Sequence, residues 1–326
     1  MKNNWKKVLM IVFSALLILS ACGENEGKKQ ETSGKKFEIG VTQIAEHPSL
    51  NAAFDGFKKA IEDAELDADY TVKIAAGDMS ANTTIATDLV NSNVDLIFAN
   101  TTDSAMAVVG ATKEIPIVFT SVTDAVGADL VESMENPGGN VTGTSDTHPD
   151  AIPNTMKFLK EELGATKIGM VFNAGEQNSR AQVDTAKKIA EELDIKVEEA
   201  SVSTTAEVKQ ATEALIGKVD AIYIITDNTV VSALESVISV ANENEIPLMV
   251  GEFDSVERGG LGAFGFDYYE IGYEAGEMAV KILKGEKKPS ELPVQYPQNL
   301  RLVINKDAAA KMGVTIKDEW NAKFSE

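Results

Sequence analysis

Polar side chains follow the apolar runs of this sequence, where a parallel sheet presents the carboxyl ends of its strands. Open parallel sheets bind ligands at that edge, so we predict that these side chains line a binding site. The predicted site residues are Gln43, His47, Thr101, Thr102, Ser104 and Ser121 in the first half of the chain, and Asn173, Glu176, Asn178, Ser179, Asp227, Asn228 and Asp267 in the second.

The two halves of this set differ in chemistry. Thr101, Thr102, Ser104 and Ser121 supply hydroxyls where helices begin, and such positions suit an anion such as a carboxylate. The second half is rich in carboxylates and amides, which suit an ammonium or hydroxyl groups. A small zwitterion such as an amino acid would satisfy both halves. Taken singly, each Ser, Thr, Asp or Asn is equally well explained as the N-cap of a helix.

Signals of catalysis are weak. The chain has two histidines, His47 and His148, without metal-ligand spacing, and it lacks a G-x-S-x-G elbow and a P-loop. Three glycines match G-x-G-x-x-G but lie before and inside a predicted strand, which is the wrong context for a dinucleotide site. We interpret Glu252 and Asp254 as a polar loop and the Tyr268–Tyr269 pair as part of a hinge. The sequence predicts no enzyme activity, metal or cofactor.

Short apolar runs alternate with longer segments of helical spacing. The runs are FEIGVTQ, VDLIFANTT, IPIVFTSVT, KIGMVFNAG, DAIYIITDN, IPLMVGEF and LGAFGFD. They are nearly continuous rather than alternating, which is typical of parallel strands covered on both faces. Between them, Leu50, Phe54, Phe57 and Ile61 recur at helical steps and form one apolar face. The pattern predicts a doubly wound α/β fold.

The pattern runs twice, which predicts two lobes. The turn-rich stretch PGGNVTGTSD separates the two series, and further crossings are expected near Asp267 and near PVQYPQN. Three crossings between two similar lobes describe a hinged clamp. We predict that residues 37–145 and 267–294 form the first lobe and that residues 146–266 and 295–326 form the second.

The first 36 residues read as a leader and a tether. Three lysines precede the apolar run Val8 to Leu19, which is too short to span a bilayer comfortably. Leu-Ser-Ala-Cys then places the only cysteine of the chain, Cys22, at a cleavage position. We predict a lipoprotein signal peptide (1–21), lipidation of Cys22 and a flexible tether (22–36). The alternative is an ordinary signal peptide with an incidental cysteine.

The net charge restricts the partners. The formal charge is −21 at pH 7, and loss of residues 1–21 with their three lysines would make it −24. Such acidity argues against nucleic acid and against flat adsorption to anionic lipid. It suits a soluble body held off the membrane.

Several segments together resemble one protein family. They are GVTQIAEHPSLNAAFDGF, PIVFTSVTDAVGADLVESMENPGGNVTGTSD, FNAGEQNSRA, AIYIITDNTVVSA and GAFGFDYYEIGYEAGEMAVKILKGEKKP. These segments are similar to the substrate-binding proteins of ABC transporters in the tryptophan/tyrosine-type uptake family. The resemblance implies a type I periplasmic-binding-protein fold with two Rossmann-like lobes. It also implies delivery of a ligand to a permease powered by an ATPase, and anchoring through Cys22 outside the cytoplasmic membrane, as is usual in Gram-positive bacteria. Our default is a monomer.

The resemblance implies an aromatic amino acid as ligand. By analogy, Thr102, Ser104 and Ser121 would hold the α-carboxylate. Asp227 would hold the ammonium, with Glu176 or Asp267 as the other candidates. The ligand side chain would meet His47, Phe119 and Phe172.

Two alternatives stay open. The same clamp could bind a sugar or nucleoside, although sugar sites usually stack several aromatic rings and aromatics are only 6% of this chain. It could also serve as a sensor that presents its ligand to a membrane receptor. A hydrolase would need a nucleophile beside a base, and the sequence offers neither.

Overall fold

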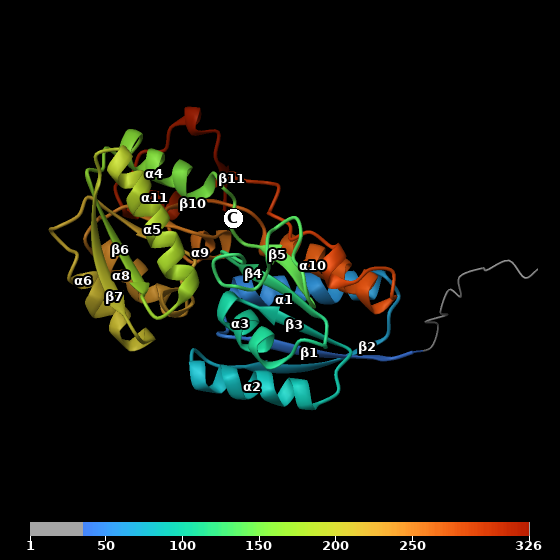
Figure 1. Cartoon of the computed structure of the whole chain (residues 1–326). Coiled ribbons are helices and arrows are strands. Elements are labelled where there is room, and N and C mark those ends of the chain that lie inside the picture. The colour runs from blue at the N-terminus through green and yellow to red at the C-terminus, as the bar shows by residue number, and fades with distance from the viewer. Residues whose placement is uncertain (1–34, 326) are drawn as a thin grey trace, which may run out of the picture. The chain divides into compact units, whose positions relative to one another are not determined.

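The computed structural model describes residues 35–325, which form two lobes, each built on its own sheet (Figure 1). The predicted signal peptide, Cys22 and nearly all of the tether lie outside the described residues. Within the described part of the chain, no helix is long and apolar enough to cross a membrane.

Lobe 1 is built on a five-stranded parallel sheet with the order β2-β1-β3-β4-β5. Its strands are β1 (Phe37–Gln43), β2 (Ala68–Ile74), β3 (Leu96–Asn100), β4 (Ile117–Val122) and β5 (Val141–Ser145). Its helices are α1 (Pro48–Asp63), α2 (Met79–Asn91), α3 (Thr102–Ala111) and α10 (Tyr268–Leu283), with the short 3-10 helix η2 (Pro289–Glu291).

Helices cover both faces of this sheet. Along β3, Ile97 and Ala99 pack with α2 and α3, whereas Leu96 and Phe98 pack with α1 and α10. The ring of Phe57 on α1 stacks on Phe98 at 4.0 Å between centroids. Because side chains of a strand alternate between faces, a strand covered on both sides must be apolar along its covered length, as β3 is from Leu96 to Ala99.

Lobe 2 is built on a seven-stranded sheet with the order β12-β11-β10-β9-β8-β6-β7, in which only the β10–β11 pair is antiparallel. Its strands are β6 (Lys167–Asn173), β7 (Lys196–Val202), β8 (Ala221–Ile224), β9 (Leu248–Val250), β10 (Gly262–Gly265), β11 (Arg301–Ile304) and β12 (Lys323–Phe324). Its helices are α4 (Ala151–Glu161), α5 (Gln177–Glu192), η1 (Thr205–Glu207), α6 (Val208–Glu213), α7 (Asn228–Val231), α8 (Leu234–Glu243), α9 (Phe253–Glu257), α11 (Lys306–Lys311) and η3 (Asp318–Trp320).

Helices α1 and α10 approach each other unusually closely because glycines line their contact. A Cβ on Gly272 would lie 1.9 Å from the carbonyl oxygen of Ala53, and one on Gly56 would lie 2.1 Å from that of Tyr269. No other residue type fits at these points. The two helix starts, which carry His47 and Tyr268, are therefore held in a fixed relation.

The α/β fold with parallel sheets in two lobes is as predicted, but one local prediction is wrong. The stretch PGGNVTGTSD was expected to be a turn-rich crossing, whereas Val141–Ser145 form the buried strand β5. Its threonines replace apolar residues because they bond to backbone: Thr142 donates to the carbonyl of Leu292 (2.6 Å) and Thr144 to that of Ile271 (3.0 Å).

Candidate functional site

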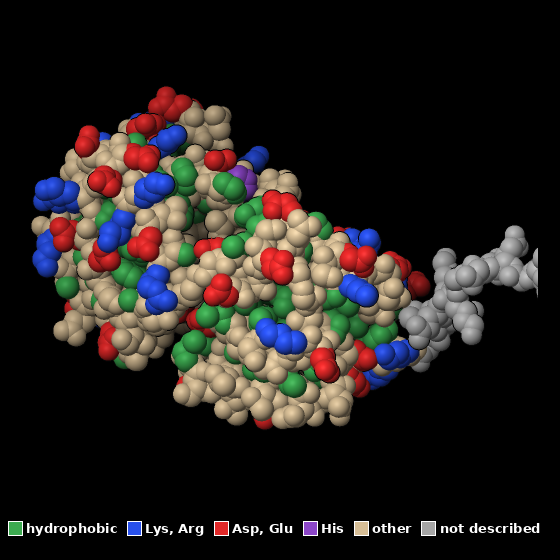
Figure 2. Space-filling view, in the orientation of Figure 1, with side chains coloured by type: hydrophobic (Ala, Val, Ile, Leu, Met, Phe, Trp, Pro, Cys, Tyr) green, Lys and Arg blue, Asp and Glu red, His purple; other side chains and the backbone are tan. Residues whose placement is uncertain are grey.

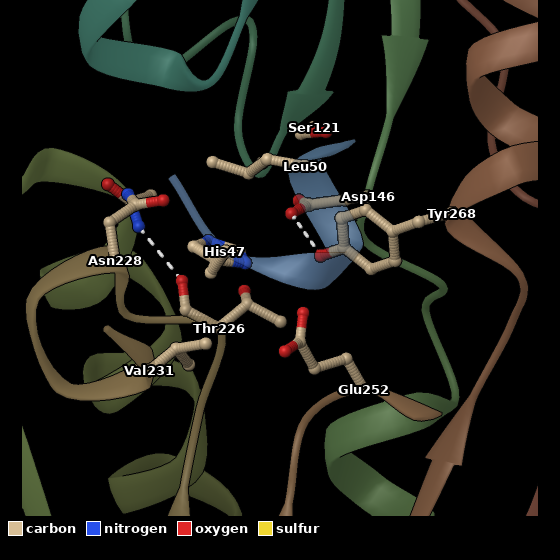
Figure 3. Close-up of a pocket in the computed structure, with 10 residues that line it drawn as sticks. His47, Leu50, Ser121, Asp146, Thr226, Asn228, Val231, Glu252 and Tyr268 are labelled. Atoms are coloured by element: carbon tan, nitrogen blue, oxygen red, sulfur yellow. Dashed lines mark hydrogen bonds between the residues drawn. The ribbon is translucent and has the colours of Figure 1, made fainter. Parts of the chain in front are cut away.

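An enclosed cavity lies between the two lobes at the carboxyl ends of their strands (Figure 3). Its volume is about 10 Å³, which is room for about one water molecule. An amino-acid-sized ligand therefore enters only when the lobes move apart. The lining residues are His47, Leu50, Ser121, Asp146 and Tyr268 from lobe 1 and its connection, and Asn178, Thr226, Asn228, Val231 and Glu252 from lobe 2.

His47 precedes α1 and closes one wall of the cavity. Pro48 starts the helix at the first position, where a missing N–H costs nothing, and His47 is extended without capping the helix through its side chain. Within residues 35–325 its Nδ1 atom is buried and makes no hydrogen bond. Burial lowers the pKa of His47 to about 4, so the imidazole is neutral at pH 7.

Asp146 follows β5 and faces the cavity beside Tyr268, the first residue of α10. The tyrosine hydroxyl donates to one carboxylate oxygen (2.8 Å), as Figure 3 shows. Thr123 donates to the other (2.9 Å). Burial raises the pKa of Asp146 to about 6 despite these two hydrogen bonds. Asp146 therefore remains mainly ionised at pH 7.

Glu252 follows β9 and precedes α9, so lobe 2 supplies a second carboxylate to the cavity. It is 1% exposed and accepts a hydrogen bond from Ser255 (2.7 Å). Burial raises the pKa of Glu252, and the nearby hydroxyl of Ser49 across the cleft lowers it. Among the described residues, however, Ser49 Oγ makes no hydrogen bond of normal geometry. Among the described residues, neither Lys nor Arg lines the cavity, so its two carboxylates suit a cationic group.

Ser121 reaches the cavity from a strained position at the end of β4. Its φ of 55° lies in the left-handed region, and the register of β4 with β5 shifts at this point. Its hydroxyl donates to Asn100 (2.8 Å), whose side-chain amide donates in turn to Gln43 (2.9 Å). This chain of buried hydrogen bonds holds the floor of the cavity in lobe 1.

Asn178 and Asn228 form the lobe 2 wall. The Nδ2 atom of Asn178 donates to the carbonyl of Thr226 (3.1 Å), while its Oδ1 atom is buried and, among the described residues, makes no hydrogen bond. Asn228 begins α7 and donates through both its backbone N–H (3.1 Å) and its side chain (2.7 Å) to Glu176. Asn178 thus offers an acceptor to a ligand.

Glu176 and Asp227 are buried but already have their partners inside lobe 2. Glu176 accepts four hydrogen bonds from Asn228 and Thr229. Asp227 accepts bonds from the Asn173 N–H (2.6 Å), the Ser179 hydroxyl (2.7 Å) and the Val230 N–H (2.7 Å). Burial and the charge of Glu176 raise the pKa of Asp227. Both carboxylates fix the start of α7 next to the cavity.

The structure brings four of the predicted site residues to the cavity: His47, Ser121, Asn178 and Asn228. Five lie behind its walls, in the hydrogen-bond networks that lead to the lining residues: Gln43, Asn173, Glu176, Ser179 and Asp227. Four have local bonding roles instead: Thr101 caps α3, Thr102 accepts from the Thr123 N–H, Ser104 donates to Asn82, and Asp267 caps α10.

Six lining residues were absent from the predicted set: Leu50, Asp146, Thr226, Val231, Glu252 and Tyr268. Glu252 follows an apolar run as the predicted residues do, but we assigned it to a polar loop. Asp146 closes the stretch that was taken for a turn. Tyr268 was assigned to the hinge, and its aromatic ring next to a chain crossing was the signal for a role in the cavity.

Comparison with known proteins places the chain in a family. Residues 38–325 match the family model of the ABC transporter substrate-binding proteins. The "Tyrosine-binding protein" of Clostridioides difficile (strain R20291) is 39% identical over 333 residues, covering 98% of this chain and 96% of that protein. These relatives are substrate-binding proteins and not enzymes.

Two solved structures inform the arrangement of the lobes. The crystal structure of an ABC domain from Streptococcus pneumonia in complex with L-Trp is 32% identical, covers 89% of this chain and 100% of that one, and superposes with a TM-score of 0.84. The ligand-free, open structure of a substrate-binding protein from Clostridium difficile is 38% identical, covers 89% and 99%, but has a TM-score of 0.66. The chain therefore superposes better on the L-Trp complex than on the open, ligand-free structure, although the latter is the more identical of the two.

These comparisons agree with the fold and with the expectation from the sequence. The predicted type I periplasmic-binding-protein fold is confirmed by the two parallel-sheet lobes and by the solved neighbours. The match to the family model spans nearly all described residues, and the relative from C. difficile spans nearly the whole chain. The protein belongs to the family of ABC transporter substrate-binding proteins.

Proposed function

We propose that the protein captures an aromatic amino acid, tyrosine or tryptophan, in the cavity between its lobes and delivers it to an ABC permease driven by a cytoplasmic ATPase. The observation that carries this proposal is the pair of buried carboxylates, Asp146 and Glu252, in a cavity lined by no Lys or Arg among the described residues. A ligand ammonium would supply the missing charge. A relative named for tyrosine and a neighbour bound to L-Trp support the choice of ligand.

We assign a role to each end of the ligand from the residues that line the cavity. Asp146 and Glu252 take the ammonium in place of Asp227, whose oxygens are already occupied inside lobe 2. The neutral imidazole of His47, which carries one N–H, is the donor available to the α-carboxylate, because Ser121 already donates its only hydroxyl hydrogen to Asn100. Leu50, Val231 and Tyr268 provide apolar contact for the ring.

Transport requires movement and no covalent chemistry. The ligand stabilises the closed arrangement to the extent that it contacts both lobes, and the hinge is the set of chain crossings between them. Because Asp146 and Glu252 lie on opposite sides of the cleft, an ammonium between them contacts both. Closing the cleft also sets the surface that the permease meets.

The same proposal places the protein outside the cytoplasm. Substrate-binding proteins of ABC importers act outside the cytoplasmic membrane, and we add that this one is a monomer tethered by a lipid on Cys22. Radiolabelled palmitate tests the anchor: incorporation that is lost in Cys22→Ala supports it, and incorporation that persists in the variant contradicts it.

Isothermal calorimetry with a ligand panel tests the binding function. We expect tyrosine or tryptophan to bind, and Glu252→Gln to weaken binding by about tenfold or more, because a charge-assisted hydrogen bond to the ammonium becomes a neutral one. The matched control is Glu243→Gln, an exposed glutamate on α8 whose loss should leave the affinity unchanged.

Two results would contradict the proposal. Binding of sugars or nucleosides without amino acids would keep the transport role but overturn the zwitterion assignment of the cavity. Amino-acid binding that is equally strong in Glu252→Gln and Asp146→Asn would show that the ammonium lies elsewhere.

A further inference from the structure

A second and larger hollow lies between the lobes, outside the inner cavity. Its volume is about 770 Å³, compared with about 10 Å³ for the inner cavity. It opens where the carboxyl ends of the edge strands β2 and β7 face each other, and Figure 2 shows the surface hollowed between the two lobes. We call it the outer groove. Its walls include Ile74, Met79 and Asp103 of lobe 1 and Glu176, Ser203 and Thr229 of lobe 2.

Asp103 is the unusual residue of the outer groove. It lies in the first turn of α3, is 3% exposed, and its Oδ2 atom makes no hydrogen bond within residues 35–325. A buried carboxylate oxygen without a donor is costly, whereas Glu176 and Asp227 each satisfy several donors. The Oδ2 atom of Asp103 can therefore still accept a hydrogen bond from a partner outside the chain.

The charges that face Asp103 come from lobe 2. Burial and, after it, the charge of Glu176 raise the pKa of Asp103 to about 7, while Arg180 on α5 acts in the opposite direction. Arg180 is exposed, does not line the groove, and already donates to the carbonyl of Ala174. The groove thus has excess negative charge on both walls.

The remaining walls of the outer groove define the rest of the ligand. Its acidic residues are Glu46, Asp103 and Glu176, and among the described residues no Lys or Arg lines it. Apolar side chains stand beside them, with Met79 50% and Ile74 39% exposed. A cation with an apolar body matches both features. Its charge pairs with the Asp103 carboxylate, and its body covers the exposed apolar side chains of Ile74 and Met79.

We propose that the outer groove is a second binding site, for a small organic cation that carries a primary ammonium on an apolar body and places that ammonium against Asp103. The site differs from the inner cavity in its residues, apart from the shared Asn228, and it does not depend on the amino-acid ligand proposed for that cavity. Since both lobes line the groove, an occupant favours the closed arrangement.

A titration with phenethylamine hydrochloride, followed by NMR of backbone amides, tests the proposal. We expect shifts at groove residues such as Gly77 and Ser203, and none with the neutral 2-phenylethanol or the anionic 3-phenylpropionate. Asp103→Asn should weaken amine binding about tenfold or more, since it removes the charge from the ammonium's partner. Asp88→Asn, which removes an exposed carboxylate of α2 outside the groove, should not.

Two further arms separate this inference from the proposed function. Saturating L-tyrosine and the variant Glu252→Gln should both leave amine binding intact if the sites are distinct. Arg180→Ala should tighten amine binding, because the competing cation is removed. The proposal is overturned if the amine binds neither wild type nor Arg180→Ala, if 2-phenylethanol binds equally well, if Asp103→Asn binds normally, or if tyrosine displaces the amine.

Discussion

Lobe 2 and the cleft contain two pairs of buried carboxylates that differ in how many donors the protein supplies. Glu176 accepts five hydrogen bonds and Asp227 accepts three, all from lobe 2. Asp146 accepts two from side chains and Glu252 accepts one. Burial alone therefore does not distinguish an acid that organises the fold from one that awaits a ligand. The number of hydrogen-bond donors that the protein supplies to each carboxylate does distinguish them.

The largest effect is expected where the donors are saturated. Asp227→Asn turns one of two acceptor oxygens into an NH2 donor that faces another donor, so we expect the free energy of unfolding to fall by about 2–4 kcal/mol although burial and Glu176 raise the pKa of Asp227. Urea denaturation measures this loss. Ligand affinity of the protein that remains folded should change little. A variant with normal stability but lost affinity would show that Asp227 binds the ligand rather than stabilising the fold.

The cavity pair should behave in the opposite way. Asp146→Asn keeps the acceptor for Tyr268 but removes a charge whose burial is costly, so we expect the free energy of unfolding to stay within about 1 kcal/mol of wild type. Affinity for an amino acid should fall about tenfold. Calorimetry and denaturation of the same sample check both halves. A strong loss of stability would show that Asp146, like Glu176 and Asp227, mainly stabilises the fold.

The stability of the protein should depend on pH because burial raises the pKa of several carboxylates. Burial raises the pKa of Asp146 to about 6 and that of Asp103 to about 7, above the value of about 4 in an unfolded chain. As pH falls from 8 to 5 the folded state takes up protons that the unfolded state does not bind, and the free energy of unfolding rises. His47 opposes this between about 6.5 and 4, because burial lowers its pKa.

The raised carboxylates outnumber this one histidine, so without ligand the midpoint of thermal unfolding should be higher at pH 5.5 than at pH 8. Amino-acid affinity should move the other way and weaken as Asp146 is protonated. Asp146→Asn should reduce both slopes. A midpoint that falls steadily from pH 8 to 5.5 would mean that the buried acids are ionised without cost.

The smallest effect concerns the hydroxyl that Asp146 does receive. Tyr268→Phe removes a 2.8 Å hydrogen bond but keeps the ring, so we expect a loss of stability of about 1 kcal/mol. The pKa of Asp146 should rise further, since the bond favours its ionised form. The pH at which amino-acid affinity is half lost reports this shift, and an unchanged value would show that the hydroxyl does not act on the carboxylate.

The sequence predicted the fold class because its information is periodic. Continuous apolar runs such as that around Phe98 and helical steps such as Leu50 to Ile61 appear wherever two layers of helix cover a sheet. The strand β5 was not predicted, because its threonines donate to distant carbonyls, at Leu292 and Ile271, that no local pattern reveals. Edge strands β2 and β7 alternate in burial and were not among the predicted strands either.

The site was harder to predict than the fold. Residue type and position after a strand identified the right edge of each sheet, and His47, Ser121, Asn178 and Asn228 do reach the cavity. Which acid faces inward depends on partners far away in the chain. Glu176 meets donors fifty residues later, at Asn228 and Thr229, whereas Glu252 meets only Ser255 nearby. A single sequence does not disclose that difference.

The contact between α1 and α10 also governs the order in which the chain can fold. One face of the lobe 1 sheet is covered by helices from opposite ends of the described chain, and their glycine contact leaves no gap for a substitute. Strands β6 to β10 of lobe 2 are consecutive in the chain, with no segment of lobe 1 between them. During synthesis lobe 2 can therefore condense before lobe 1, whose core near Phe98 must wait for α10. Pulse-labelled hydrogen exchange should show protection of the Val171 amide before that of Phe98.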